Sequence, residues 1–310
     1  MEPGLASVFQ RIDEWRRFRP TIDSSIELGF VPTMGALHAG HASLLDRARR
    51  ECDLVALSIF VNPTQFDDPA DLAAYPTNLD ADIAVAESCG VDYVLLPDRT
   101  QVYPDDYRYH VNETEFSNEL CGEHRPGHFD GVLTVVLKLL NLVQPTISIF
   151  GRKDAQQLAS VKRMALDLNV DVEIVQAPII REPDGLAMSS RNQYLSPPDR
   201  QSATALWRAL EAASVRETAT AAKRAATQIL DQAAAANPNF VLDYAEVVDP
   251  DTFAVLDDED SGPALLVAAA TISSTRLIDN VDLTLADPPQ VEEDEDKDGD
   301  RIGAARGVRS

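Results

Sequence analysis

The sequence of 310 residues contains few lysines, few cysteines and no long apolar run. Lys and Arg together number 27 against 51 Asp and Glu, which gives a formal net charge of −24. A surface of this sign repels a phosphate backbone, so we expect no nucleic-acid partner. No stretch approaches the roughly 18 apolar residues of a membrane-spanning helix, so we expect no membrane span. The first 25 residues also lack the apolar centre of a signal peptide.

The three cysteines are Cys52, Cys89 and Cys121. An odd number at such wide spacing matches neither a disulfide framework nor a metal-binding pattern. We therefore expect a reducing, cytoplasmic compartment. The acidic composition leaves two explanations open. It is either an adaptation to a salt-rich cytoplasm, or a bias toward arginine over lysine combined with an acidic run after residue 290.

The segment from Gly29 to Ser43 combines a strand, a turn and the start of a helix. Apolar spacing predicts a strand over 26–31 and a helix over 41–51. His38 and His41 lie three residues apart at the junction, so they share a helix face. The N–H groups and partial positive charge of a helix start favour phosphate. Taken alone, the pair is also compatible with a helix start that happens to carry two histidines.

Apolar strands and helices alternate between residues 26 and 175, which predicts an α/β fold with a doubly wound parallel sheet. A short helix over 6–18 is expected before the first strand. The other strands of this sheet are expected at 54–61, 91–96, 147–150 and 170–175. Beyond these, an alanine-rich helical region and three strands predict a smaller α/β domain. The expected bounds of those later elements are 198–236 for the helices and 241–248, 264–272 and 276–285 for the strands.

These patterns divide the chain into three parts. We expect a doubly wound α/β domain over 1–179 and a smaller C-terminal domain over 180–287. The acidic run predicts a disordered tail over 288–310. Neither a dinucleotide fingerprint nor a P-loop is present in the sequence.

Polar residues follow the strand expected at 54–61, in the segment Asn62-Pro-Thr-Gln-Phe66. Ligands bind at the carboxyl ends of strands in open α/β sheets, so Gln65 is a candidate to hold a small polar substrate. An ordinary Asn-Pro turn is the alternative. Further along, Asp82 lies in the first turn of a helix expected over 79–88. It either complements the helix dipole or lies near a magnesium–phosphate complex.

A second strand–glycine–helix junction lies at Gly151-Arg-Lys-Asp-Ala-Gln-Gln157. Lys153 is placed to hold a phosphate, and Asp154 is a candidate N-cap. The loop Ser189-Ser-Arg191 offers two hydroxyls and a forked guanidinium, which suit a triphosphate. A plain surface turn is the alternative for this loop.

One more segment, residues 122–131, carries Arg125 and His128 before an apolar helix expected over 132–143. Lys138 is isolated within that helix. Its amino group either extends to water or meets an anion.

The string Pro32-Thr-Met-Gly-Ala-Leu-His-Ala-Gly-His41 resembles the signature of the pantoate–β-alanine ligase (pantothenate synthetase) family, in the HIGH nucleotidyltransferase superfamily. Four further motifs follow in the order typical of the family. They lie at residues 60–66, 122–138, 151–157 and 181–195. The resemblance implies that residues 1–179 form a Rossmann-like domain that binds nucleotide and pantoate. It also implies that the C-terminal domain over 180–287 closes as a lid, and that the protein is a homodimer. This chain departs from the family at Thr77, where the family usually has Arg.

The resemblance implies a reaction in two steps that belongs to pantothenate and coenzyme A biosynthesis. The carboxylate of (R)-pantoate attacks the α-phosphorus of ATP, supplied as its Mg²⁺ complex, and pyrophosphate leaves. The amine of β-alanine then attacks the pantoyl adenylate and releases AMP. No covalent enzyme intermediate is needed. Two alternatives stay open: another HIGH-type adenylyltransferase, or a non-catalytic relative that binds nucleotide.

The same resemblance assigns roles to individual residues, with His41 at the position of the family's proton donor. The implied catalytic residues are His38, His41, Lys153, Ser189, Ser190 and Arg191. The implied ATP-binding residues are Met34, Gly35, Ala36, Leu37, His38, Ala39, Gly40, His41, Gly151, Arg152, Lys153, Asp154, Ile180, Met188, Ser189, Ser190 and Arg191. The candidates for pantoate or β-alanine are Met34, Phe60, Asn62, Gln65, Tyr75, Arg125 and Gln157. Asp82 is the candidate for contact with the magnesium of Mg–ATP.

Overall fold

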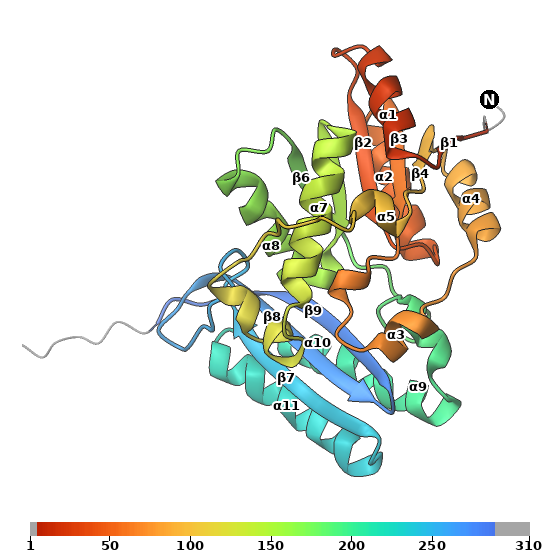
Figure 1. Ribbon diagram of the computed structural model, residues 1–310. Helices are drawn as coiled ribbons and strands as arrows, with labels where there is room; N and C mark the ends of the chain where they lie inside the picture. The colour runs from red at the N-terminus through yellow and green to blue at the C-terminus, as the bar shows by residue number, and fades with distance from the viewer. Residues whose placement is uncertain (1–4, 289–310) are drawn as a thin grey trace, which may run out of the picture.

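The computed structural model describes residues 5–288, which form two sheets with helices around them (Figure 1). The strands of the larger sheet are β1 (Ser7–Phe9), β2 (Leu28–Thr33), β3 (Leu54–Ile59), β4 (Tyr93–Leu95), β5 (Ile147–Gly151) and β6 (Glu173–Ala177). The helices around it are α1 (Ile12–Phe18), α2 (Ala39–Glu51), α3 (Pro69–Ala74), α4 (Leu79–Ser88), α5 (Arg99–Val102), α6 (Cys121–His124), α7 (His128–Val143) and α8 (Ala155–Asp167). Apart from its first residue, the predicted tail over 288–310 lies outside the described residues.

The strands of the larger sheet are parallel and lie in the order β1-β4-β3-β2-β5-β6. From β2 the chain passes outward through β3 to β4, and then crosses to the other side of β2 to form β5 and β6. The direction of winding therefore reverses between β2 and β5. This order confirms the predicted doubly wound sheet.

The first segment of the chain differs from its prediction. A helix was expected over residues 6–18, but Ser7–Phe9 pairs in parallel with β4 and the helix begins only at Ile12. Phe9 packs edge-on against Trp15, with ring centroids 5.2 Å apart. Three residues are too few to separate a strand period from a helical one. Pairing with β4 also covers a sheet edge that would otherwise expose unpaired N–H and C=O groups.

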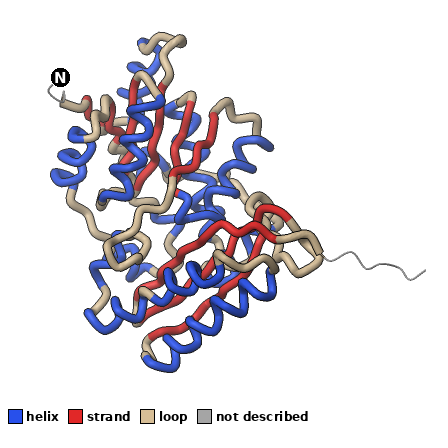
Figure 2. Tube along the Cα trace, turned by 180° about the vertical axis from the view of Figure 1, so that it is seen from behind, coloured by secondary structure: helices blue, strands red, loops and turns tan. Residues whose placement is uncertain are grey.

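Helices cover both faces of the larger sheet (Figure 2). Successive strand residues point to opposite faces. Phe30 of β2 accordingly lies in a core with Leu133 of α7 and Val161 of α8. Its neighbour Val31 lies in a separate core with residues of α2 and α4, such as Leu45. Burial on both faces explains why these strands read as continuous apolar runs.

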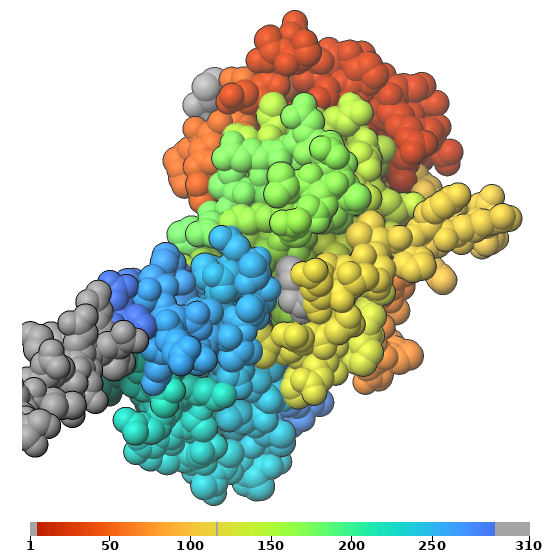
Figure 3. Space-filling model, turned by 90° about the vertical axis from the view of Figure 1, so that its left-hand side faces the viewer, coloured from red at the N-terminus to blue at the C-terminus, as the bar shows by residue number. Residues whose placement is uncertain are grey.

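The C-terminal part is a three-stranded antiparallel sheet with helices on one face. Its elements are α9 (Pro197–Ala203), α10 (Ala205–Ala213), α11 (Ala219–Ala236), β7 (Phe240–Val248), β8 (Gly262–Ile272) and β9 (Thr275–Leu285). On the other face, Leu265 and Val267 of β8 pack with Ala155 and Ala159 of α8. The C-terminal part (cyan and blue in Figure 3) is thus in contact with the larger-sheet part. Across residues 5–288, no helix has the length and apolar character to cross a bilayer.

Candidate active site

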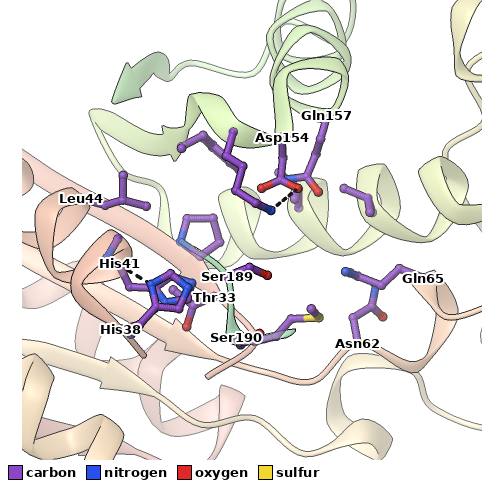
Figure 4. Close-up of a pocket in the computed structure, with 18 of the residues that line it drawn as sticks. Thr33, His38, His41, Leu44, Asn62, Gln65, Asp154, Gln157, Ser189 and Ser190 are labelled. Atoms are coloured by element: carbon purple, nitrogen blue, oxygen red, sulfur yellow. Dashed lines mark hydrogen bonds and ion pairs between the residues drawn. The ribbon is translucent and has the colours of Figure 1, made fainter. Parts of the chain in front are cut away.

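The carboxyl ends of β2 and β5 lie next to each other where the winding of the sheet reverses. Open α/β sheets bind their ligands at this point. From β2 the chain turns into α2, and from β5 it passes through the short 3-10 helix η4 (Arg152–Asp154) into α8. A cavity of about 250 Å³ lies here (Figure 4), and we call it the β2–β5 cavity.

The β2–β5 cavity brings together most of the predicted site residues from segments far apart in the sequence. The predicted residues that line it are Met34, His38, Gly40, His41, Phe60, Asn62, Gln65, Tyr75, Arg125, Gly151, Lys153, Asp154, Gln157, Ile180, Met188, Ser189, Ser190 and Arg191. The predicted residues outside its lining are Gly35, Ala36, Leu37, Ala39, Asp82 and Arg152. Pro32, Thr33, Phe66 and His128 also line it and were not among the assigned site residues.

His38 and His41 form a reciprocal cap at the start of α2. The Nδ1 atom of His38 accepts a hydrogen bond from the N–H of Gly40 at 3.1 Å, and the Nδ1 atom of His41 lies 3.3 Å from the N–H of His38. The ring centroids are 4.1 Å apart. Because both Nδ1 atoms accept, each neutral ring carries its proton on Nε2.

Burial keeps both histidines uncharged. It lowers the pKa of His41 to about 3, with a smaller contribution from His38. Burial also lowers the pKa of His38, assisted by the positive charge of Lys153. At neutral pH the pair therefore offers two Nε2–H donors rather than an imidazolium ion. Such donors suit oxygens whose charge grows during a reaction.

Asp82 of α4 holds the turn between β2 and α2. Its carboxylate accepts hydrogen bonds from the N–H of Ala36 at 3.0 Å and of Leu37 at 2.7 Å, and the residue is 3% exposed. Gly35 has a φ of +83°, and a Cβ there would lie 2.8 Å from the Asp82 carboxylate. The Asp82 oxygens therefore bind this turn and the residue does not line the cavity, while its contact with magnesium stays a prediction.

Lys153 lies at the junction between β5 and α8, and strand β9 holds this junction in place. The Nδ2 atom of Asn280 donates to the main-chain oxygens of Arg152 at 3.0 Å and Lys153 at 3.1 Å. The side chain of Arg152 forms an ion pair with Asp282 of β9, so it faces the C-terminal sheet rather than the cavity. Asp154 occupies the N-cap position of α8 without the predicted side-chain cap, and its carboxylate lies 4.0 Å from the Lys153 amino group.

The loop Ser189-Ser-Arg191 connects the two sheets, and Ser189 and Ser190 lie beside the histidines (Figure 4). The hydroxyl of Ser189 accepts from the N–H of Arg191. The guanidinium of Arg191 forms an ion pair with Asp71 of α3 at 2.9 Å. Nearby, burial raises the pKa of Tyr75, whose hydroxyl bonds to Ser190. Thr77 is exposed and does not line the cavity.

Gln65 and Gln157 lie on the side of the cavity away from the histidines (Figure 4). The main-chain oxygen of Gln65 accepts from His128 Nδ1 at 2.8 Å and from Arg125 Nη2 at 3.0 Å. Burial, assisted by the charge of Arg125, lowers the pKa of His128 to about 4. Arg125 is further held by Asp67 at 3.1 Å. Its guanidinium is thus bound largely within the protein.

Lys138 is half-buried on α7, which is compatible with an amino group that extends to water. Its amino group lies over the ring of Tyr107, 4.9 Å from the centroid, and 5.5 Å from that of Tyr103. Aromatic faces attract cations, which explains a lysine inside an apolar helix.

Comparison with known proteins places this site in a family. The family model described as Pantoate-beta-alanine ligase matches residues 7–282. The pantothenate synthetase of Acetivibrio thermocellus is 48% identical over 256 residues, which cover 82% of this chain and 90% of the relative. That of Pseudothermotoga lettingae is 45% identical over 275 residues, covering 88% and 97%.

Two solved structures agree with the sequence matches. Pantothenate synthetase from Thermus thermophilus superposes with a TM-score of 0.81 at 42% identity, covering 88% of this chain and 98% of that one. Pantoate–β-alanine ligase from Francisella tularensis, described as complexed with β-γ ATP and β-alanine, gives a TM-score of 0.75 at 33% identity, covering 89% of this chain and 97% of that one. The family model, the related sequences and the solved structures all match most of this chain. The chain therefore belongs to the pantoate–β-alanine ligase family.

Proposed function

We propose that the β2–β5 cavity is where this chain, an ATP-dependent ligase, joins (R)-pantoate to β-alanine through a pantoyl adenylate. Pyrophosphate leaves in the first step, and AMP and pantothenate are the final products. The observation that carries this assignment is the division of the cavity into two sides. The histidines, Ser189 and Ser190 lie on one side, and the two neutral amides Gln65 and Gln157 lie on the other (Figure 4).

The first side suits the phosphates of ATP. His38 and His41 present Nε2–H donors, and Lys153 and the Ser189-Ser-Arg191 loop add a positive charge and hydroxyls. Displacement at phosphorus depends mainly on positioning and on stabilising developing charge. In this role His41 acts as a hydrogen-bond donor, because its ring is neutral before ATP binds.

The second side suits pantoate. Gln65 and Gln157 bind carboxylate and hydroxyl oxygens without placing a fixed charge beside the attacking carboxylate. Met34 and Phe60 supply apolar surface for the dimethyl end. Asn62, which was predicted at the β-alanine entrance, is only 1% exposed and bonds to Gln65. This burial favours a role for Asn62 in positioning Gln65. Tyr75 then remains the candidate for contact with β-alanine at the opening of the cavity.

We further propose that ATP binds as its magnesium complex. Magnesium usually keeps several waters and binds through substrate phosphates with one or two carboxylates. Asp154 fits this pattern, because its carboxylate lines the β2–β5 cavity beside Lys153. Within residues 5–288, no group of three or more His, Cys, Asp or Glu is placed to hold the ion without the phosphates. We also propose that the protein is a homodimer in the cytoplasm.

Exchange of pyrophosphate into ATP tests the proposal. With pantoate present and β-alanine absent, exchange should occur, and omission of pantoate should abolish it. Addition of β-alanine should then yield AMP and pantothenate. Exchange that depends on a different acid would favour another HIGH-type adenylyltransferase. Binding of ATP without exchange for any acid would favour a non-catalytic relative.

A further inference from the structure

The orientation of the Asn62 amide is fixed by a main-chain group. Asn62 follows β3 and is buried, and its Nδ2 lies 3.1 Å from the main-chain oxygen of Gly131 in α7. A carbonyl oxygen only accepts hydrogen bonds, so the atom that faces it must be the amide nitrogen. The Oδ1 atom therefore points the other way, where it accepts from the hydroxyls of Tyr103 and Thr64, each at 2.9 Å.

The orientation of Asn62 determines that of Gln65. The Nδ2 atom of Asn62 also donates to Oε1 of Gln65 at 2.9 Å. Because this nitrogen can only donate, the Gln65 atom that faces it must be the oxygen. The Nε2 atom of Gln65 is then turned into the cavity, as Figure 4 shows. Gln65 thus offers an N–H donor, and it selects a substrate atom that accepts.

We propose that Tyr103 is a positioning residue for pantoate. Its O–H donates to Asn62, Asn62 donates to Gln65, and Gln65 donates to a pantoate oxygen. This inference rests on the proposed contact between Gln65 and pantoate. Tyr103 itself lies behind the cavity wall, outside the residues that line it.

The surroundings of Tyr103 keep its hydroxyl protonated and in place. The residue is 9% exposed, and its ring packs against Phe60 at 6.2 Å and edge-on against Tyr107 at 5.1 Å. The amino group of Lys138 lies over the same ring system. Burial raises the pKa of Tyr103 to about 12, so the hydroxyl stays a donor throughout the working pH range.

Replacement Tyr103→Phe removes the hydroxyl and keeps the ring. Only Thr64 then holds the Asn62 oxygen, so Asn62 and Gln65 become less ordered. We expect KM for pantoate to rise about three- to tenfold, the usual effect of losing one neutral hydrogen bond. The KM for ATP and kcat should change less than twofold. Tyr107→Phe is the matched control, because Tyr107 packs on the same ring but contributes no bond to Asn62 in the described contacts.

A double-variant cycle separates a positioning role from a general loss of packing. If Tyr103 acts through Gln65, Tyr103→Phe should raise KM for pantoate in the parent enzyme but not in the Gln65→Ala background. An equal rise in both backgrounds, or no rise in the parent, would overturn the inference. If Tyr103→Phe does not fold, Thr64→Val removes the second hydroxyl on the same Asn62 oxygen and should give the same pattern.

The cycle also distinguishes this inference from the proposed function. An unchanged KM for pantoate in Gln65→Ala alone would remove Gln65 from pantoate binding. A raised KM in Gln65→Ala, together with an unaffected Tyr103→Phe, would preserve the role of Gln65 and reject only the chain of hydrogen bonds behind it.

Discussion

The side-chain nitrogen of Asn280 lies 3.1 Å from the main-chain oxygen of Lys153 and donates a hydrogen bond to it. The two residues come from different sheets, since Asn280 is on β9 and Lys153 follows β5. The same nitrogen also binds the oxygen of Arg152. The C-terminal sheet therefore fixes the main chain that carries the lysine proposed to contact phosphate.

Asn280→Ala should lower the rate of adenylate formation and destabilise the fold. The change leaves two main-chain oxygens without their donor, which costs about 1–3 kcal/mol of unfolding free energy. Pantoate-dependent pyrophosphate exchange and denaturant unfolding measure the two effects. Asp282→Asn is the matched control on the same strand, since it weakens the ion pair with Arg152 at a side chain that is 71% exposed. Equal losses in both variants would contradict the special role of Asn280.

His41→Ala should reduce adenylate formation at least about a hundredfold, the lower end of the usual contribution of one donor to a developing charge. The reason is loss of the Nε2–H at the start of α2, while ATP should still bind to the remaining donors. Single-turnover formation of pantoyl adenylate is the appropriate measurement. His110→Ala, at an exposed histidine, serves as the control. Adenylate formation near the parent rate would exclude His41 from the mechanism.

Acid should destabilise the fold through His128. Its pKa is about 4 in the folded chain, against about 6.5 for an unperturbed histidine in the unfolded chain. Below pH 6.5 the unfolded state takes up a proton that the folded state does not. The unfolding free energy should therefore decrease as the pH is lowered. The contribution of His128 to this decrease should be about 2 kcal/mol between pH 6.5 and pH 4.5.

Denaturant unfolding at several pH values tests this prediction about His128. His128→Asn should show a weaker dependence on pH than the parent, because asparagine does not titrate. His110→Asn should keep the parent dependence, since that residue is exposed. A His128→Asn variant with the parent slope would show that other groups cause the acid sensitivity.

Asp82→Asn should raise KM for ATP without altering the magnesium requirement. The new amide group cannot accept from both Ala36 and Leu37, so the turn before α2 becomes less ordered. We expect a KM increase of about tenfold, consistent with the loss of a hydrogen bond to a charged group. Titration of activity with Mg²⁺ at saturating ATP is the second measurement. A shift of the half-saturating Mg²⁺ concentration would instead support the role predicted from the sequence.

Much of the fold could be predicted from local patterns. Helix α4 has the bounds expected for it, and β2, β3 and β5 end within two residues of their predicted ends. These elements have strong periodicity or continuous apolar runs. Strand β6 was expected at 170–175 and is observed at Glu173–Ala177. The alternating apolar residues there begin before the strand pairs with β5, and periodicity does not report where pairing starts.

The sequence alone predicted the candidate site. The spacing of His38 and His41, the position of Lys153 after a strand, and the ordered motifs of the family are all properties of the linear chain. They suffice because a parallel sheet gathers the ends of its strands at one edge, wherever those strands lie in the sequence.

Only the tertiary structure decided which polar groups support the site and which face it. Asp82 binds a turn 45 residues away, and His128 binds an oxygen 63 residues away. Arg152 turns to β9, whereas the neighbouring Lys153 lines the cavity. A hydrogen bond depends on distances and angles between two groups in space. No local pattern records them when the partners come from separate elements.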